Sequence, residues 1–159
     1  MKVFIIYDSL FGNTEEIANA IGEAFSHFHN TIVLKAEKAD PTNLEESDML
    51  IIGSPTHGGW FTEPIKKFIA SLPAEVLQNI KTATFDTSLP TSNMGFVMNH
   101  LAKLFGNAAP RIAKKLNKKG LNVLDSKIFY VLGKEGPLQD GEIEKARKWA
   151  DQLNNLVSG

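Results

Sequence analysis

The chain of 159 residues contains no cysteine. This absence excludes disulfide scaffolds, thiolate zinc sites, iron–sulfur clusters and cysteine nucleophiles. A chain of this length can bury about 68 to 70% of its unfolded surface in one core, so the fold needs neither a metal nor a disulfide. We therefore expect a single domain that spans residues 1–159.

Long apolar runs are also missing. No segment approaches the about 18 apolar residues of a membrane span, and the run 3–7 is too short for a signal peptide. We expect a cytoplasmic protein with no membrane span. Neither sign of charge dominates, and the net charge of −1 argues against nucleic acid as a partner. Residues 1–80 nevertheless carry 5 basic and 11 acidic side chains, against 12 and 7 in residues 81–159, an asymmetry that can orient a partner.

Short apolar runs alternate along the chain with longer segments of helical spacing. Strands are predicted at 3–7, 31–34, 49–52, 82–85 and 121–131, the last bent near Asp125, and helices from residue 15, at 65–72, 95–105, 108–119 and after a cap at Asp140. The nearly unbroken apolar run 3–7 is typical of a strand covered on both faces. Repeated strand–helix–strand units predict a doubly wound α/β fold, with a parallel sheet between two helix layers.

The loop after the first strand has the composition of an anion site. It reads Ser9-Leu10-Phe11-Gly12-Asn13-Thr14, without lysine or arginine, and it opens onto a helix that we expect Asn13 or Thr14 to cap. Backbone N–H groups, two hydroxyls and one amide can surround a phosphate without a countercharge, and Gly12 permits close approach. The same residues are also those of an ordinary turn and cap. The ending of a mononucleotide P-loop is missing.

The loop after the third strand suits a flat ring. It contains Pro55, Thr56, His57, Gly58, Gly59 and Trp60. Adjacent glycines permit close approach, and the indole offers a stacking face. Alternatively, Trp60 packs the loop onto its own helix and His57 is a solvated residue. We predict that His57, if it lies near a redox-active ring, makes the reduction potential depend on pH.

The loop after the fourth strand carries groups that can hydrogen-bond the edge of a heterocycle. Asp86 and Thr87 are the best placed of them. The alternative is an ordinary polar loop in which Asp86 accepts hydrogen bonds from nearby N–H groups.

Together these motifs resemble the flavodoxin family over nearly the whole chain. The resemblance is carried by residues 3–7, 9–15 and 53–56 and by the closing helix, without a long insertion in the fifth strand. It implies the strand order 2-1-3-4-5 and noncovalent FMN. By resemblance, residues 9–14 hold the FMN phosphate, residues 55–60 border the isoalloxazine, and Asp86 with Thr87 meets the pyrimidine edge. It also implies electron transfer with redox partner proteins, a reductase donor and an acceptor.

Three features depart from the family pattern. Phe11 replaces a hydroxyl residue, the fourth-strand loop lacks an aromatic stacker, and the chain is nearly neutral where electron carriers are strongly acidic. The neutrality leaves open an FMN-dependent NAD(P)H or quinone oxidoreductase of the same fold. The segment 92–107 can be a lid, a homodimer contact or core packing.

Two other classes use different chemistry. A phosphoacceptor receiver domain needs a carboxylate after the third strand, where this chain has Gly53 and Ser54. A binding module without flavin would use a basic helical stripe, formed by Arg111, Lys114, Lys115, Lys118 and Lys119. The same stripe also fits the solvated side of an amphipathic helix.

Overall fold

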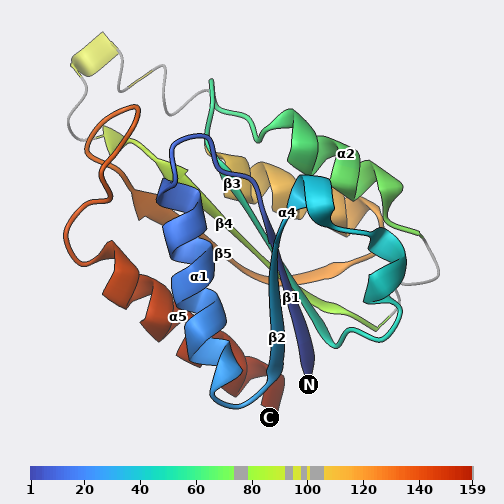
Figure 1. The fold of residues 1–159 in the computed structure, drawn as a ribbon. Coiled ribbons are helices and arrows are strands. Elements are labelled where there is room, and N and C mark those ends of the chain that lie inside the picture. Colours follow the sequence, from blue (N-terminus) through green and yellow to red (C-terminus); the bar gives the residue numbers. More distant parts are fainter. Residues whose placement is uncertain (74–78, 92–94, 98–99, 101–105, 159) are drawn as a thin grey trace.

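Five parallel strands form one sheet in the order β2-β1-β3-β4-β5 (Figure 1). The computed structural model describes residues 1–73, 79–91, 95–97, 100 and 106–158. The strands are β1 (Lys2–Tyr7), β2 (Asn30–Lys35), β3 (Met49–Pro55), β4 (Lys81–Ser88) and β5 (Asn122–Tyr130). The predicted fold class and strand order are confirmed.

Helices cover both faces of the sheet (Figure 1). The helices are α1 (Asn13–Ser26), α2 (Glu63–Ser71), α4 (Ala108–Lys118) and α5 (Glu142–Ser158), with short 3-10 turns at Ala36–Lys38 and Pro41–Leu44. Alternate residues of a strand point to opposite faces. In β1, Val3 and Ile5 pack with α1 and α5, whereas Phe4 and Ile6 pack with α2 and α4. Burial on both sides therefore explains the continuous apolar run of this strand.

Strands β3 and β4 extend three residues beyond the predicted ends at Ile52 and Phe85. The extra residues are glycine, proline or polar residues, which obscured the strand ends in the sequence. They pair with each other, Ser54 with Asp86 and Pro55 with Thr87. In β5 the register shifts between Val123 and Asp125, which agrees with the bend predicted near Asp125.

Two predicted helix caps are wrong. The cap of α1 is Gly12, at φ 93°, and not Asn13 or Thr14, both of which belong to the helix. Helix α5 begins at Glu142, and the carbonyl of Gly141 rather than Asp140 accepts from the Lys145 N–H. In both cases a glycine with positive φ turns the chain sharply into the helix, so no side-chain cap is required.

Most of the segment 92–107 lies outside the described residues. Within the helix predicted at 95–105, positions 96, 97 and 100 are helical and position 95 is not, while 98–99 and 101–105 lie outside the description. The lid and homodimer interpretations of 92–107 therefore remain predictions. Among the residues that the structure describes, no helix is long and apolar enough to cross a membrane.

Candidate functional site

A cavity of about 310 Å³ opens where β1, β3 and β4 end. Its wall contains most of the predicted site residues: Ser9, Leu10, Phe11, Asn13, Thr14, Pro55, Thr56, His57, Gly58, Gly59 and Thr87. Gly12, Trp60 and Asp86 are predicted residues that do not line it. Residues outside the predicted set of cofactor contacts complete the wall: Ser88, Leu89, Thr91, Gly106, Asn107, Val131, Gly133 and Lys134.

The first loop is shaped by Ser9 and Gly12. The Ser9 hydroxyl oxygen accepts from the N–H of Gly12 at 3.1 Å and from the N–H of Glu15 at 3.4 Å. Gly12 has φ 93°, and its carbonyl accepts the first helical bond, from the Glu16 N–H at 3.0 Å. The loop is therefore folded back on itself before α1 begins.

This geometry leaves backbone donors at the start of α1. In the described part of the chain, the N–H groups of residues 10, 11, 13 and 14 have no protein acceptor. The residues that carry them all line the cavity. Unpaired N–H groups and the positive end of a helix dipole attract an anion.

Tyr7, the last residue of β1, stabilises the turn into α1. Its hydroxyl donates to Glu15 at 2.8 Å, and Lys35 on β2 lies 3.6 Å from the same carboxylate. Burial, followed by the hydrogen bond and the charge of Glu15, raises the pKa of Tyr7 to about 12. Tyr7 therefore remains a neutral donor and ties the end of β1 to the first turn of α1.

The loop after β5 adds a cation to the cavity. The Asn13 amide donates to the Glu135 carbonyl at 3.0 Å, which holds this loop against the first one. Lys134 lines the cavity beside it. The sequence predicted no cation at this site, because Lys134 is distant in the sequence and only the sheet order brings its loop to the cavity.

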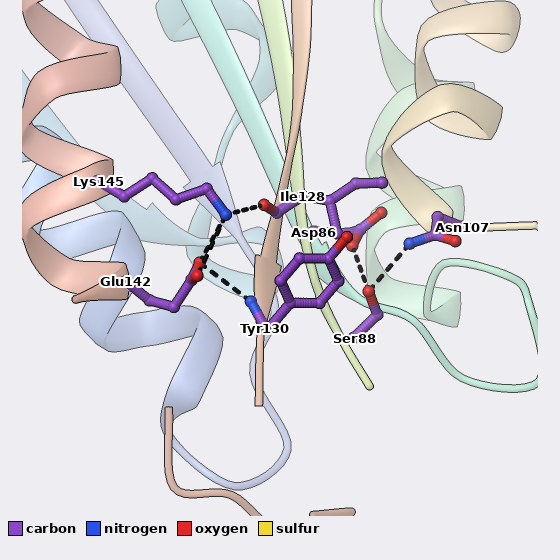
Figure 2. A network of polar contacts seen from close by, with 7 residues as sticks. All are labelled: Asp86, Ser88, Asn107, Ile128, Tyr130, Glu142 and Lys145. Carbon is purple, nitrogen blue, oxygen red and sulfur yellow. Dashed lines mark hydrogen bonds and ion pairs between the residues drawn. The ribbon is translucent and has the colours of Figure 1, made fainter. Parts of the chain in front are cut away.

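The end of β5 is fixed by a partly buried ion pair (Figure 2). Glu142 accepts from the Tyr130 N–H at 3.1 Å and pairs with Lys145 at 2.9 Å. Lys145 also donates to the Ile128 carbonyl at 2.8 Å. The pair attaches the first turn of α5 to β5, and so holds the base of the loop that carries Lys134.

The loop after β3 forms a tight turn from His57 to Trp60. The two residues exchange backbone hydrogen bonds of 2.9 and 3.0 Å, while Gly58 and Gly59 have φ 57° and 80°. Two consecutive positive φ angles are typical of a type I′ turn, and this turn favours glycine at both central positions. The predicted need for two glycines is thereby explained.

Trp60 does not lie over the cavity. Its side chain is 52% exposed, and the Arg111 guanidinium on α4 lies 4.2 Å from its ring centroid. The predicted alternative was that Trp60 packs the loop onto its own helix, and the observed contact with Arg111 of α4 differs from it. Helix α4 can reach this loop because α2 and α4 share one face of the sheet.

The last residues of β4, which the sequence predicted to be a loop, direct their polar side chains to the two faces of the sheet. The Thr87 hydroxyl lies 2.7 Å from that of Thr14, and Thr87 lines the cavity. Asp86 points to the opposite face, where it accepts from the Ala109 N–H at 2.8 Å and from the Ser88 hydroxyl at 3.1 Å (Figure 2). The structure therefore does not bring Asp86 to the cavity wall, and the alternative, a carboxylate satisfied by nearby donors, is the observed one.

Comparison with known proteins identifies the class to which this fold and cavity belong. The flavodoxin family model matches residues 5–149. A flavodoxin of Clostridium saccharobutylicum is 26% identical over 99% of this chain and 98% of its own. Among solved structures, a flavodoxin from the domain Archaea matches with a TM-score of 0.76 and 21% identity over both full chains. Oxidised Flavodoxin 1 from Bacillus cereus matches with a TM-score of 0.74 and 20% identity over 98% of each chain. The chain belongs to the flavodoxin family, whose members bind FMN and pass electrons to partner proteins.

The residues present fit this cofactor. FMN has an anionic phosphate and a flat, largely apolar ring. The unpaired N–H groups at the start of α1 suit the phosphate, and Leu10, Pro55 and Leu89 in the cavity wall suit the ring.

Proposed function

We propose that this chain is an FMN-dependent one-electron carrier whose cofactor occupies the cavity at the ends of β1, β3 and β4. The observation that carries the proposal is the group of unpaired N–H donors at the start of α1, beside a cavity with apolar walls. When bound, FMN supplies a ring that accepts and releases electrons singly. The rest of the site has to hold, orient and shield that ring.

The first loop binds the phosphate in this proposal. Residues 9–14 supply backbone N–H groups, the Thr14 hydroxyl and the positive end of the α1 dipole. Lys134 adds a positive charge from the loop after β5. Phe11, which replaces a hydroxyl residue of the family pattern, is 49% exposed and contributes its backbone N–H.

Residues 55–59 and Thr87, which line the cavity, orient the ring. The peptide between Gly58 and Gly59 rotates at low steric cost, so it can present either its carbonyl oxygen or its N–H to the ring edge. Thr87, with Ser88 and Asn107, supplies the polar groups that we assign to the pyrimidine edge in place of Asp86.

Partner proteins would dock at the mouth of the cavity. Exposed apolar side chains gather there, namely Leu10 at 53%, Phe11 at 49%, Leu89 at 39% and Leu132 at 58% exposure. With a net charge of −1, the chain has little long-range field to steer a basic partner. We therefore propose redox partners, one reductase and one acceptor, that present an apolar contact surface.

Titration of the protein with FMN tests this function. We expect one FMN per chain, tighter binding of FMN than of riboflavin, and quenching of tryptophan fluorescence that is smaller in Trp60→Phe. Steady-state oxidation of NADH and NADPH, measured with and without a quinone, separates the carrier from an oxidoreductase. Sustained turnover would favour the enzyme, and failure to bind FMN would refute both.

A further inference from the structure

A buried carboxylate beneath the cavity is not used by the proposed function. Asp86 has no exposed surface. One of its oxygens accepts from the Ala109 N–H in the first turn of α4, and the other accepts from the Ser88 hydroxyl (Figure 2). Asp86 therefore joins the end of β4 to the start of α4.

The hydrogen bonds of Asp86 connect it to residues of the cavity wall. The Ser88 oxygen also accepts from the Asn107 amide at 2.9 Å, and both residues line the cavity. The adjacent Ala108 N–H donates to the Thr56 hydroxyl oxygen at 2.9 Å. Thr56 lines the cavity from the loop after β3. One buried group, with the helix end that it caps, thus connects three segments of the wall.

We propose that Asp86 is a positioning residue for the flavin cavity, in which the ionised carboxylate holds the wall formed by Ser88, Asn107 and the start of α4, and its protonation releases that wall. The proposal rests on the proposed function only in taking a flavin as the cavity's ligand.

The observed hydrogen bonds favour the ionised form of Asp86. A carboxylate accepts at both oxygens, its charge-assisted bonds are about twice as strong as neutral ones, and it complements the positive end of a helix. A protonated acid must donate from one oxygen, which then faces the Ala109 N–H or the Ser88 hydroxyl as a competing donor. Protonation therefore weakens at least one of the two connections.

Protonation is accessible near physiological pH. Burial is the main influence and raises the pKa of Asp86 to about 6, although the hydrogen bonds from Ala109, Ser88, Asn107 and Thr56 oppose it. Strand β3 carries no titratable side chain. The other elements packed around Asp86 carry the following titratable side chains: Lys81 on β4, Asp125, Lys127 and Tyr130 on β5, Arg111, Lys114, Lys115 and Lys118 on α4, and His57 in the loop after β3. His57 also lines the cavity, so the test must separate its titration from that of Asp86.

The burial of Asp86 determines whether flavin binding favours its ionised or its protonated form. Because Asp86 already has no exposed surface, a bound flavin adds little desolvation to it. A flavin that contacts Ser88 and Asn107 instead restrains the donors in the positions that suit the ionised carboxylate. Binding therefore favours deprotonated Asp86, and flavin affinity falls as the pH is lowered.

Riboflavin affinity measured between about pH 5 and about pH 8 tests the proposal. Riboflavin is the probe because it lacks the phosphate of FMN, which itself titrates near pH ~6. We expect the wild-type dissociation constant to rise several-fold toward the acid end, and that of Asp86→Asn to stay constant. Matching pH profiles in these two proteins, or tighter binding at low pH, would overturn the proposal.

Two control variants separate other causes. Asp125→Asn removes a carboxylate that accepts from the Trp149 indole N–H at 2.7 Å on β5, outside the cavity wall. His57→Gln removes the imidazole. Both should retain the wild-type pH dependence, whatever their absolute affinities. If His57→Gln abolishes it, the dependence belongs to His57 and the assignment to Asp86 is refuted.

A second measurement needs no flavin. The amide resonance of Ala109 in the ligand-free protein should shift along one titration curve in the wild type and stay fixed in Asp86→Asn. An Ala109 resonance that does not move in the wild type contradicts the proposal. Failure of the wild type to bind riboflavin or FMN at any pH refutes the proposed function instead, and leaves the Ala109 titration as a separate result.

Discussion

At the scale of single residues, the direction of a side chain decides whether it belongs to the site. Asp86 and Thr87 are adjacent, yet Thr87 lines the cavity while Asp86 lies on the α4 side of β4. Alternation along a strand separates neighbouring residues in this way. Gly12 acts differently, because its backbone and not a side chain shapes the site: a positive φ folds the loop so that the following N–H groups keep no protein acceptor.

Gly12→Ala tests the backbone role at this position. An L-residue at φ 93° is strained by about 1 to 2 kcal/mol, so the loop should relax and displace its N–H groups. We expect FMN affinity to fall about tenfold, and riboflavin affinity to fall less, because we propose that the loop binds the phosphate. Fluorescence titration with both ligands measures the difference.

Gly120→Ala is the matched control. Gly120 has the same φ of 93°, and neither glycine has an atom within 4 Å of an added Cβ. Gly120 follows α4 and does not line the cavity. A similar loss of FMN affinity in both variants, or equal losses for FMN and riboflavin, would contradict the phosphate role.

At the scale of elements, the site depends on close packing between strands and helices behind it. Strands β3 and β4 extend together to the cavity, and their polar ends stay paired there. Behind them Gly53 lies against the ring of Phe85, which itself packs edge-on against Phe129 and Trp149. A glycine is required at this point of β3 because the aromatic cluster occupies the space of a side chain.

Gly53→Ala should therefore destabilise the fold. Its added Cβ would overlap the ring of Phe85, which has no exposed surface and packs against Phe129 and Trp149. Overpacking of this kind costs about 1 to 3 kcal/mol. Urea unfolding followed by circular dichroism gives the change in the free energy of unfolding.

The control for this substitution is Gly95→Ala. Gly95 is exposed, and its added Cβ meets no atom within 4 Å. We expect a change within about 0.5 kcal/mol. Equal stability of the two variants would mean that the Phe85 ring yields more easily than its packing indicates.

At the scale of the whole molecule, the winding of the chain creates the cavity. From β1 the sheet grows toward β2 on one side and toward β3, β4 and β5 on the other. The connections that follow β1 and β3 therefore leave the sheet in different directions, and a crevice opens between them. The same winding places the loop after β5 beside the first loop, so that Asn13 donates to the Glu135 carbonyl and Lys134 lines the cavity.

Because the cavity is formed only in the folded chain, its ligand should stabilise the whole molecule. FMN at about 100 times its dissociation constant should add about 2.7 kcal/mol to the free energy of unfolding. For a chain of this length that corresponds to a rise in Tm of about 5 to 10 °C. Calorimetry with FMN, and with AMP as an anionic ligand without a flavin, measures it. An equal rise with AMP would indicate a phosphate site without a ring site.

Much of this protein could be predicted from local sequence signals. The apolar runs and helical spacings predicted the parallel sheet and its two helix layers, because periodicity reflects which faces are buried. The loops after β1 and β3 were also predicted from local signals. Gly12, Gly58 and Gly59 mark turns with positive φ angles, which other residues adopt only at a steric cost. These features depend on neighbours along the chain, which the sequence displays directly.

The remainder depended on contacts between distant segments. The side of the sheet to which Asp86 points was decided by strand register and by the placement of α4, and the partner of Trp60 was decided by the approach of Arg111. Lys134 and Asn107 joined the cavity only because the sheet order brings their loops to it. The sequence by itself determined the fold and the loop at the start of α1 that we propose for the phosphate. The tertiary structure decided which polar groups complete the cavity and which lie beneath it, because those contacts are made by residues far apart along the chain.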